Sequence, residues 1–511
     1  MRDTVKIMPV GNIDRRSMVT QGKSSAVLSR ENLMVIGVDE KDRFIRKVPG
    51  ANRYNSTSVG SFGVSSMTRY YAQDKSRKNF FFSGGRVYFI DENGNASEVL
   101  SLFDVNAYPT FVEMQVSSAH ILYFMEGIST GMYSHDGNMA NAWTKEEAVT
   151  LNFVDAVSWL DRLWGFEENS EDLYFSVNLA PTDFTDSTDA GVITIGARRG
   201  SKLQRIVVGK DDNLYIFKTD SIWVIEGKTP SEFRVRELSP NMGLAARRSL
   251  QKVNEGMVGL MSDYEVYSFD GNSFKLLTYN VAMSGDFTTK LEPMINRNKM
   301  DEVNSCYHNF VYRMSFVENG KDTPDMEYCF NTINETEFFT RGFKIASYLV
   351  YDRIPDKNEL VFGRADAGRL MRMYHGLNPD NGDSGSMFII KTKTKFNGLG
   401  MSRNFRVRKV WLDANVREAR NIPIRQYVDG RFLYTDGVSE NMDTFGEGNS
   451  ILGMSSQSAV TSRQIPRHAN SKCQNVAFEI DYQLRDLDVE FSGFEIEIIG
   501  KNQKRSHKVG V

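Results

Sequence analysis

The residue types that most often bind metals or act as nucleophiles are scarce and scattered in this sequence. Six histidines occur among 511 residues, and no pair has the His-x-x-x-His spacing of a helical zinc site. The one Gly-x-Ser-x-Gly sequence, Gly127–Gly131, lies between two expected strands and not at the strand-to-helix turn that positions a nucleophilic serine. We therefore predict no enzymatic activity, catalytic residue, metal site or bound cofactor, and surface or packing roles for the histidines. These are His120, His135, His308, His375, His468 and His507.

The cysteines point to a compartment rather than to chemistry. Cys306, Cys329 and Cys473 are too few and too far apart for a disulfide framework in a chain of this length. Cys306 and Cys329 could lie on neighbouring strands, and small buried thiols are the expected state. The cysteine content thus predicts folding in a reducing compartment.

One polar stretch begins like a calcium-binding loop. Asp91, Asn93 and Asn95 have the spacing of the first three ligand positions. The sixth position is Ala96, where an EF-hand needs glycine, and the twelfth is Leu102, where it needs a bidentate glutamate. We therefore expect a hairpin turn at this place.

Glycoside hydrolysis is the main enzymatic alternative. A sialidase Asp-box needs Ser-x-Asp-x-Gly-x-x-x-Trp, and the stretch Ser134–Gly137 lacks the residue before glycine. Carboxylates are abundant, but the sequence places no pair at the separation of about 5 to 10 Å that glycosidases need. This alternative therefore stays open without assigned residues.

Basic residues with strand periodicity are the candidates for an interaction surface. Lys391, Lys393 and Lys395 alternate along the sequence, so they share one face of an expected strand. Arg406 and Arg408 share a face of the next strand in the same way. This basic stripe could contact DNA or an acidic partner subunit. Alternatively, its lysines could keep an edge strand from pairing with other chains.

The elements that position these residues are predicted to be short β-strands. The composition, with 41% hydrophobic residues, 12% aromatic residues and 40 glycines against 12 prolines, suits an all-β chain with a large core. The formal net charge of −3 gives no global field of the kind that marks a dedicated nucleic-acid binder. Any binding of polyanions must therefore be local.

The stretch from Arg205 to Leu277 shows the pattern most clearly. Its apolar runs alternate with turn clusters as in antiparallel hairpins, which predicts two adjacent four-stranded units with Trp223, Ile225, Val266 and Phe269 in the core. Two helical segments, residues 245–253 and 282–291, are expected as connectors.

An internal repeat supports a propeller. The sequences YSHDGN at Tyr133–Asn138 and YSFDGN at Tyr267–Asn272 agree at five of six positions. Unit starts recur at roughly forty to fifty residues, which is the range of propeller blades. We predict an all-β fold with a β-propeller of six to eight blades, about seven units by this spacing.

The domain organisation follows from changes in this rhythm. Residues 1–78 are expected to form an N-terminal arm with entry strands, and residues 79–377 the propeller. The sequence NPDNGDSGS, residues 378–386, has the composition of a linker. Longer alternating strands then predict a β-sandwich-like domain over residues 387–511.

The order of several segments resembles a known family. The segments are RLWGF, LYFS and PTDF within Arg162–Phe184, then LYIFKTDSIWVIEG and GMVGLMSDYEVYSFDGNSF within Leu214–Phe274, and finally RKVWLDA. This succession is similar to the β-propeller tail proteins of short-tailed bacteriophages, the nozzle or packaged-DNA stabilisation proteins. The likeness extends in layout from about Asn79 to the C-terminal region.

The resemblance implies a structural role in the virion tail. Such proteins form a ring, commonly a hexamer, below the portal-adaptor complex, where they close the DNA exit channel, retain the genome and conduct DNA during ejection. The implied partners are further copies, the portal or adaptor and other tail proteins, with DNA passing without sequence-specific binding. Assembly in the host cytoplasm agrees with an N-terminus that lacks an apolar signal region and with the absence of an apolar run of about 18 residues.

Two other function classes remain as alternatives. A receptor-binding or glycan-binding adhesive propeller would need aromatic residues on exposed loops, for which Trp143 and Trp159 are candidates, although core packing suits both. A glycosidase-like or sialidase-like propeller enzyme is the other.

A charge reversal tests the basic stripe. We expect replacement of Lys391, Lys393 and Lys395 together by glutamate to impair particle assembly or DNA retention if the stripe is an interaction surface, because attraction becomes repulsion. Unchanged assembly and retention would leave the lysines only the protection of an edge strand.

Overall fold

The computed structural model describes most of the chain, and the statements below concern those residues. The ranges outside the description are residues 1, 8–18, 21–26, 38–42, 56, 129–130, 198–199, 255, 279–290, 355–356, 384, 395, 398–404, 417–420, 429–430, 440–475, 485–488 and 501–511. The helical elements of the described part are three 3-10 turns, η2 (Arg247–Ser249), η3 (Glu292–Met294) and η4 (Arg297–Glu302). All other regular elements are strands, as predicted.

The first four blades are separate four-stranded antiparallel sheets. Blade 1 contains β7 (Val64–Tyr71), β8 (Arg77–Ser83), β9 (Arg86–Ile90) and β10 (Ala96–Ser101). Blade 2 contains β11 (Thr110–Val116), β12 (Ala119–Met125), β13 (Met132–His135) and β14 (Thr144–Lys145). Blade 3 contains β15 (Phe153–Trp159), β16 (Arg162–Glu167), β17 (Asp172–Phe175) and β18 (Gly191–Thr194). Blade 4 contains β19 (Leu203–Val208), β20 (Leu214–Lys218), β21 (Ile222–Glu226) and β22 (Arg234–Ser239).

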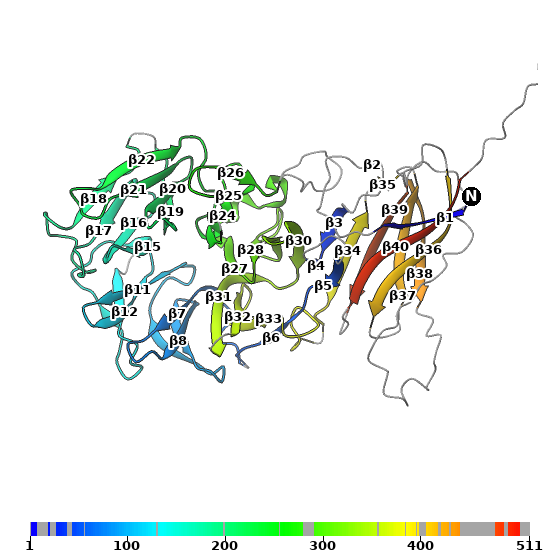
Figure 1. Cartoon of the computed structure of the whole chain (residues 1–511). Helices are drawn as coiled ribbons and strands as arrows, with labels where there is room; N and C mark the ends of the chain where they lie inside the picture. The colour runs from blue at the N-terminus through cyan, green and yellow to red at the C-terminus, as the bar shows by residue number, and fades with distance from the viewer. Residues whose placement is uncertain are drawn as a thin grey trace, which may run out of the picture.

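Three further four-stranded units complete the ring (Figure 1). Blade 5 contains β23 (Gln251–Val253), β24 (Gly256–Leu260), β25 (Val266–Phe269) and β26 (Phe274–Leu276). Blade 6 contains β27 (Asn304–His308), β28 (Val311–Phe316), β29 (Met326–Asn331) and β30 (Thr336–Arg341), and its outer strand continues into a larger sheet. Blade 7 contains β31 (Ile345–Ile354), β32 (Lys357–Arg364), β33 (Leu370–Met373) and the N-terminal strand β6 (Ala51–Arg53).

The cores lie between the blades, as they must in a propeller. Each neighbouring pair of sheets shares one hydrophobic cluster, including a cluster between blade 7 and blade 1 that closes the circle. Over the described residues, the propeller thus has seven blades. Blades 1 to 5 and blade 7 are separate four-stranded sheets, whereas blade 6 is part of the larger sheet. The fold class is the predicted one, within the predicted bracket of six to eight blades.

The two adjacent units predicted around Arg205–Leu277 are blades 4 and 5. Ile225, Val266 and Phe269 are buried, and the half-buried Trp223 packs against the cluster between blades 3 and 4. The core prediction is therefore confirmed, with Trp223 at the margin.

The repeated YSxDGN sequences occupy equivalent places, where the third strand of blades 2 and 5 turns into the fourth. The Asp136 and Asp270 carboxylates each accept a main-chain N–H two residues later, at 2.9 and 2.8 Å, which is an Asx-turn. Gly137 and Gly271 have φ of +81° and +102°, a region that glycine enters without steric conflict. The local turn chemistry explains the recurrence.

A second β domain stands beside the propeller (Figure 1). One sheet contains β1 (Arg2–Ile7), β40 (Val489–Gly500), β5 (Phe44–Lys47), β4 (Leu33–Ile36) and β36 (Phe405–Val416). The other continues from β30 through β3 (Val27–Glu31), β34 (Phe388–Thr394), β39 (Val476–Leu484), β35 (Phe396–Asn397) and β2 (Val19–Thr20), and β37 (Asn421–Val428) and β38 (Arg431–Ser439) join it at β39. Buried and half-buried residues alternate along β34, as predicted for this region.

The observed boundaries differ from those predicted. The propeller starts before residue 79, because β7 begins at Val64 and β6 belongs to blade 7. Residues 1–78 are not a separate arm, since β1, β3 and β5 pair with C-terminal strands of the second β domain, and β4 joins the same sheet through β5. The pairings of β1, β3 and β5 with these C-terminal strands join residues hundreds of positions apart, so they leave no local pattern in the sequence.

Two local predictions also fail. Residues 245–253 contain one 3-10 turn, η2, followed by β23, instead of a helix. Pairing of Gln251–Val253 with β24 overrides the helical preference of Ala245, Ala246 and Leu250. The second expected helix, residues 282–291, lies almost wholly outside the described residues.

Candidate functional site

A cavity of about 370 Å³ lies where the inner strands of the propeller converge. It is lined by residues from all seven blades, among them Thr68 of β7, Thr110 of β11, Ala156 of β15 and Ser347 of β31. Its charged lining residues are Glu126, Glu168, Arg205, Arg247, Arg248 and Asp301. The size is within the range of small-molecule sites, so the state of these charges decides what the cavity can do.

Arg248 bridges blades that face each other across this cavity. From η2 in blade 5 it donates hydrogen bonds to the main-chain oxygen of Ser65, at 2.7 Å, and to that of Asp301. Its guanidinium also lies 4.2 Å from the ring centroid of Tyr108. Burial lowers the pKa of Arg248 to about 10, and the nearby Arg247 and Arg205 act in the same direction while Tyr108 and Asp301 oppose it.

Arg247 extends to the opposite side. It pairs with Glu168 of blade 3 at 2.8 Å and donates to the main-chain oxygen of Val154 at 3.4 Å. Adjacent arginines in one 3-10 turn therefore tie blade 5 to blades 1 and 3 and to η4, which leads into blade 6. Such cross-links suit a rigid ring, because each replaces water around a guanidinium by fixed protein acceptors.

A buried carboxylate supports the same region. Asp155 is fully buried and accepts from the Arg205 guanidinium at 2.5 Å and from the main-chain N–H of Ile206 at 2.9 Å. Burial raises the pKa of Asp155, and the Arg205 charge opposes this shift. The pair joins β15 to β19, so blades 3 and 4 are locked at the cavity wall.

The cavity is consequently a cross-linked centre. Arg205 and Arg247 have carboxylate partners, and Arg248 donates to two carbonyls. The side chain of Arg248 crosses the region where a passage along the propeller axis would run. The chemistry that this arrangement supports best is mechanical stiffness of the ring.

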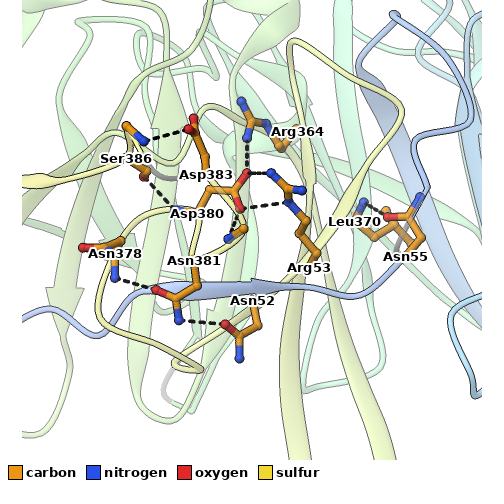
Figure 2. A network of polar contacts seen from close by, with 12 residues as sticks. Asn52, Arg53, Asn55, Arg364, Leu370, Asn378, Asp380, Asn381, Asp383 and Ser386 are labelled. Carbon is orange, nitrogen blue, oxygen red and sulfur yellow. Dashed lines mark hydrogen bonds and ion pairs between the residues drawn. The ribbon is translucent and has the colours of Figure 1, made fainter. Parts of the chain in front are cut away.

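The closing blade carries a second polar centre (Figure 2). The Asp380 carboxylate accepts from Arg53 Nε at 3.0 Å and Nη2 at 3.2 Å, and from Arg364 Nη1 at 2.8 Å. Asp380 is only 4% exposed. We call Asp380, Arg53 and Arg364 the closure node. Residues 378–386, predicted as a linker, thus include a buried folded element, because the polar residues that mark linkers also make Asx-turns.

The pH dependence of stability tests the contribution of Asp366, a carboxyl that neighbours the closure node. Burial alone would raise the pKa of this carboxyl, but hydrogen bonds from Arg364 and Lys344 lower it to about 2. When the folded-state pKa of a carboxyl lies below its unfolded value, the carboxylate stabilises the fold at pH values above the unfolded pKa. This stabilisation is lost as the pH falls through the folded pKa. We expect Asp366→Asn to reduce stability by about 2 kcal/mol at pH 6 and by almost nothing near pH 2. Urea denaturation at both pH values measures this difference, and an effect independent of pH would contradict it.

The structure describes only part of the predicted basic stripe. Lys391 and Lys393 are on β34 opposite Asp481 and Glu479 of β39, and Lys393 pairs with Glu479 at 3.3 Å. Arg425 also contacts both of these carboxylates. Lys395 is outside the described residues.

Arg406 and Arg408 fall in β36, and their side chains are not described. The structure therefore puts the two arginines in a different sheet from the lysines. The two described lysines face a row of opposite charge, and a role of the stripe in binding stays a prediction.

The tryptophans considered for glycan binding are buried. Trp143 is 8% exposed and packs against Phe80 with ring centroids 5.6 Å apart. Trp159 is 3% exposed, and its indole N–H donates to the main-chain oxygen of Asp212 at 2.7 Å. Core packing, the other role considered for both, is what the structure shows.

The remaining candidates of the sequence have local roles. Asp91 accepts from the main-chain N–H groups of Asn93 and Asn95 at 2.9 and 2.7 Å, so its carboxylate shapes the expected hairpin turn. Cys306 and Cys329 are buried free thiols, as expected. In the part of the chain that the structure describes, no three or more His, Cys, Asp or Glu side chains gather as metal ligands would.

Sequence reasoning missed the arginines of the cavity and the closure node. Arg247 and Arg248 lie in a segment predicted to be helical. In a helix, two adjacent arginines are expected on the exposed face, so they give no sign of a cavity. The polar bonds of Arg53 with Asp380 span more than 300 residues and give no local signal. The adjacency of Arg247 and Arg248 between two strands of neighbouring blades was the one signal that could have suggested the cavity.

Comparisons with known proteins leave the family open. No protein-family model and no curated protein matches the chain. Solved structures that match include a streptogramin B lyase, at 13% identity and a TM-score of 0.40 over 63% of this chain and 95% of that one. A putative gluconolactonase matches at 9% identity and a TM-score of 0.34, over 64% of this chain and 92% of that one.

A third match is the extracellular domain of a putative hybrid two component system from B. thetaiotaomicron. It has 11% identity and a TM-score of 0.42, over 71% of this chain and 44% of that one. None of the three is described as a phage protein. At these identities and scores the matches do not indicate what this chain binds or does.

Within the described residues, no helix has the length and apolar character needed to cross a membrane. The arrangement of four-stranded sheets, with one shared core between each neighbouring pair, makes the chain a β-propeller protein with an additional β domain.

Proposed function

We propose that the chain is a structural tail protein of a short-tailed bacteriophage, a nozzle subunit. Copies form a closed ring, commonly a hexamer, below the portal-adaptor complex. The ring retains packaged DNA and conducts it during ejection. The proposal starts from the resemblance of residues Arg162–Phe184 and Leu214–Phe274 to nozzle proteins.

The observation that supports it most is the continuous sheet between propeller and β domain. Strand β3 lies between β30 of blade 6 and β34 of the β domain, and Glu31 of β3 is the register partner of Phe339. Asn32 fixes this junction. Its main-chain N–H donates to Phe339 O at 2.7 Å, and its side chain donates to Ile389 O at 2.8 Å and accepts from Arg341 N at 2.7 Å. A subunit that must carry load between neighbours needs such a junction, because separately folded domains joined by a flexible linker would transmit little force.

The cross-linked cavity adds a constraint on the path of DNA. Arg248 and Arg247 bridge opposite blades at the centre of the propeller. In the proposed ring, DNA would therefore pass between copies rather than along the axis of one propeller. The formal net charge of −3 suits such a conduit, because a strongly basic wall would hold DNA through phosphate contacts.

Native mass spectrometry of the purified chain, combined with electron microscopy, tests the proposal. We expect a closed ring of about six copies around an opening wide enough for duplex DNA. A monomer or an open trimer under all conditions would contradict the ring. Turnover of sialyl or other glycan substrates would favour the enzymatic alternative instead.

A further inference from the structure

Blade 7 differs from the other blades in how its fourth strand is attached. In blades 1 to 6 the four strands follow each other along the chain. In blade 7 the fourth strand is β6, which pairs with β33 through Arg53, Asn52 and Ala51 opposite Met371, Arg372 and Met373. We call this pairing the seam. Because no hairpin turn joins β6 to β33, closing the seam costs the conformational entropy of bringing two distant segments of the chain together.

The segment that leads to the β domain holds β6 from its other side. Gly50 N donates to Gly376 O at 2.8 Å, Ala51 N donates to Asn378 O at 2.9 Å, and Asn381 N donates to Ala51 O at 3.0 Å. A Cβ on Gly50 would lie 1.9 Å from the main-chain oxygen of Asn378, so the two backbones approach as closely as glycine allows. β6 therefore lies between β33 and residues 376–381.

The closure node joins the seam to the β domain. Arg53 of β6 and Arg364 of β32 both donate to Asp380. Asp380 N in turn donates to the hydroxyl of Ser386, two residues before β34 begins (Figure 2). The entry to β6 and the exit from β33 are the two chain crossings between propeller and β domain, and both meet at this node.

We propose that the seam is a latch, meaning the place where the propeller opens. The closure node determines whether the seam is open, and it responds to the position of the β domain. Three register pairs and the bond from Tyr54 N to Leu370 O at 2.8 Å hold the seam without a connecting turn, whereas the hairpin-linked strands of other blades stay near each other after their hydrogen bonds break. Tension on residues 374–387 would displace Asp380 from Arg53 and release β6 before any other strand. This inference goes beyond the proposed tail function and does not require it.

Hydrogen exchange of the full chain, followed by mass spectrometry, tests the latch in the variant Asp380→Asn. We expect exchange in residues 50–54 and 370–374 to become faster by about tenfold or more, because Arg53 loses its carboxylate partner and Arg364 keeps only Asp366, so the charged bonds that tie β6 to residues 378–386 are lost. Blade 4 should keep its protection. The matched control is Asp383→Asn, an exposed carboxyl of the same loop that accepts from Gly385 N, and it should leave the seam unchanged.

A disulfide separates opening of the seam from general destabilisation. Both main-chain groups of Ala51 are used by residues 378 and 381, so Ala51 and Met373 form a non-hydrogen-bonded pair, whose Cα atoms are typically about 4.5 Å apart. That separation suits a disulfide. Adding Ala51→Cys and Met373→Cys to Asp380→Asn should restore protection of the seam when oxidised and lose it when reduced. Equal acceleration in all blades, or no acceleration at the seam, would overturn the proposal.

Discussion

Replacing Glu327 by glutamine should lower the free energy of unfolding by about 3 to 5 kcal/mol, because it leaves a buried guanidinium without its counter-charge. Arg313 and Glu327 are 1% and 2% exposed, and their side chains approach to 3.2 Å between β28 and β29. Tyr348 of blade 7 also donates to Glu327, at 2.7 Å. The loss should therefore loosen the contact between blades 6 and 7. Urea denaturation followed by circular dichroism measures it.

An exposed ion pair supplies the control. Lys275 and Glu335 link blades 5 and 6 at 2.7 Å, with both side chains more than 60% exposed. We expect Lys275→Gln to change stability by about 0 to 1 kcal/mol, since water screens this pair. A double replacement, Arg313→Met with Glu327→Leu, should be less destabilising than Glu327→Gln alone, because no buried charge is left. Equal losses in the buried and exposed variants would refute the argument.

Replacing Asn32 by alanine should separate the β domain from the propeller, at a loss of about 3 kcal/mol or more. Two effects add. Ile389 O and Arg341 N lose their side-chain partner at a residue that is 1% exposed. The backbone of Asn32 has a φ of +55°, which asparagine tolerates better than alanine.

Glycine at the same position distinguishes these effects. Asn32→Gly keeps the left-handed backbone without strain and loses only the hydrogen bonds, so it should be less destabilising than Asn32→Ala. Calorimetry of Asn32→Ala should show two thermal transitions, one for the propeller and one for the β domain. The unmodified chain should show a single transition, because the two are joined. If both variants unfold as the original does, Asn32 does not hold the junction.

Sequence reasoning succeeded where the signal was local. Blades 4 and 5 follow from apolar runs and turn residues that are adjacent in the chain, and the strands of the β domain follow from clean alternation, as along β34. The turn at Asp91 follows in the same way, because an Asx-turn is formed by residues within a few positions of each other.

It failed where distant segments meet. β6 is too short and too polar to be recognised as the last strand of a propeller, and its partner β33 lies more than 300 residues further on. Arg30 shows the same limit: it is 1% exposed and donates to Glu337 O, although a lone arginine is normally expected at the surface. Burial of such groups depends on partners that no sequence window contains.

The attachment of β6 also sets an order for folding during synthesis. Blades 1 to 6 can each form as soon as their own strands have left the ribosome, since these strands are consecutive. β6 must wait for β33, which at ordinary rates of translation takes on the order of tens of seconds. During that interval the exposed edge of a three-residue strand offers little to a wrong partner, so its brevity protects the nascent chain.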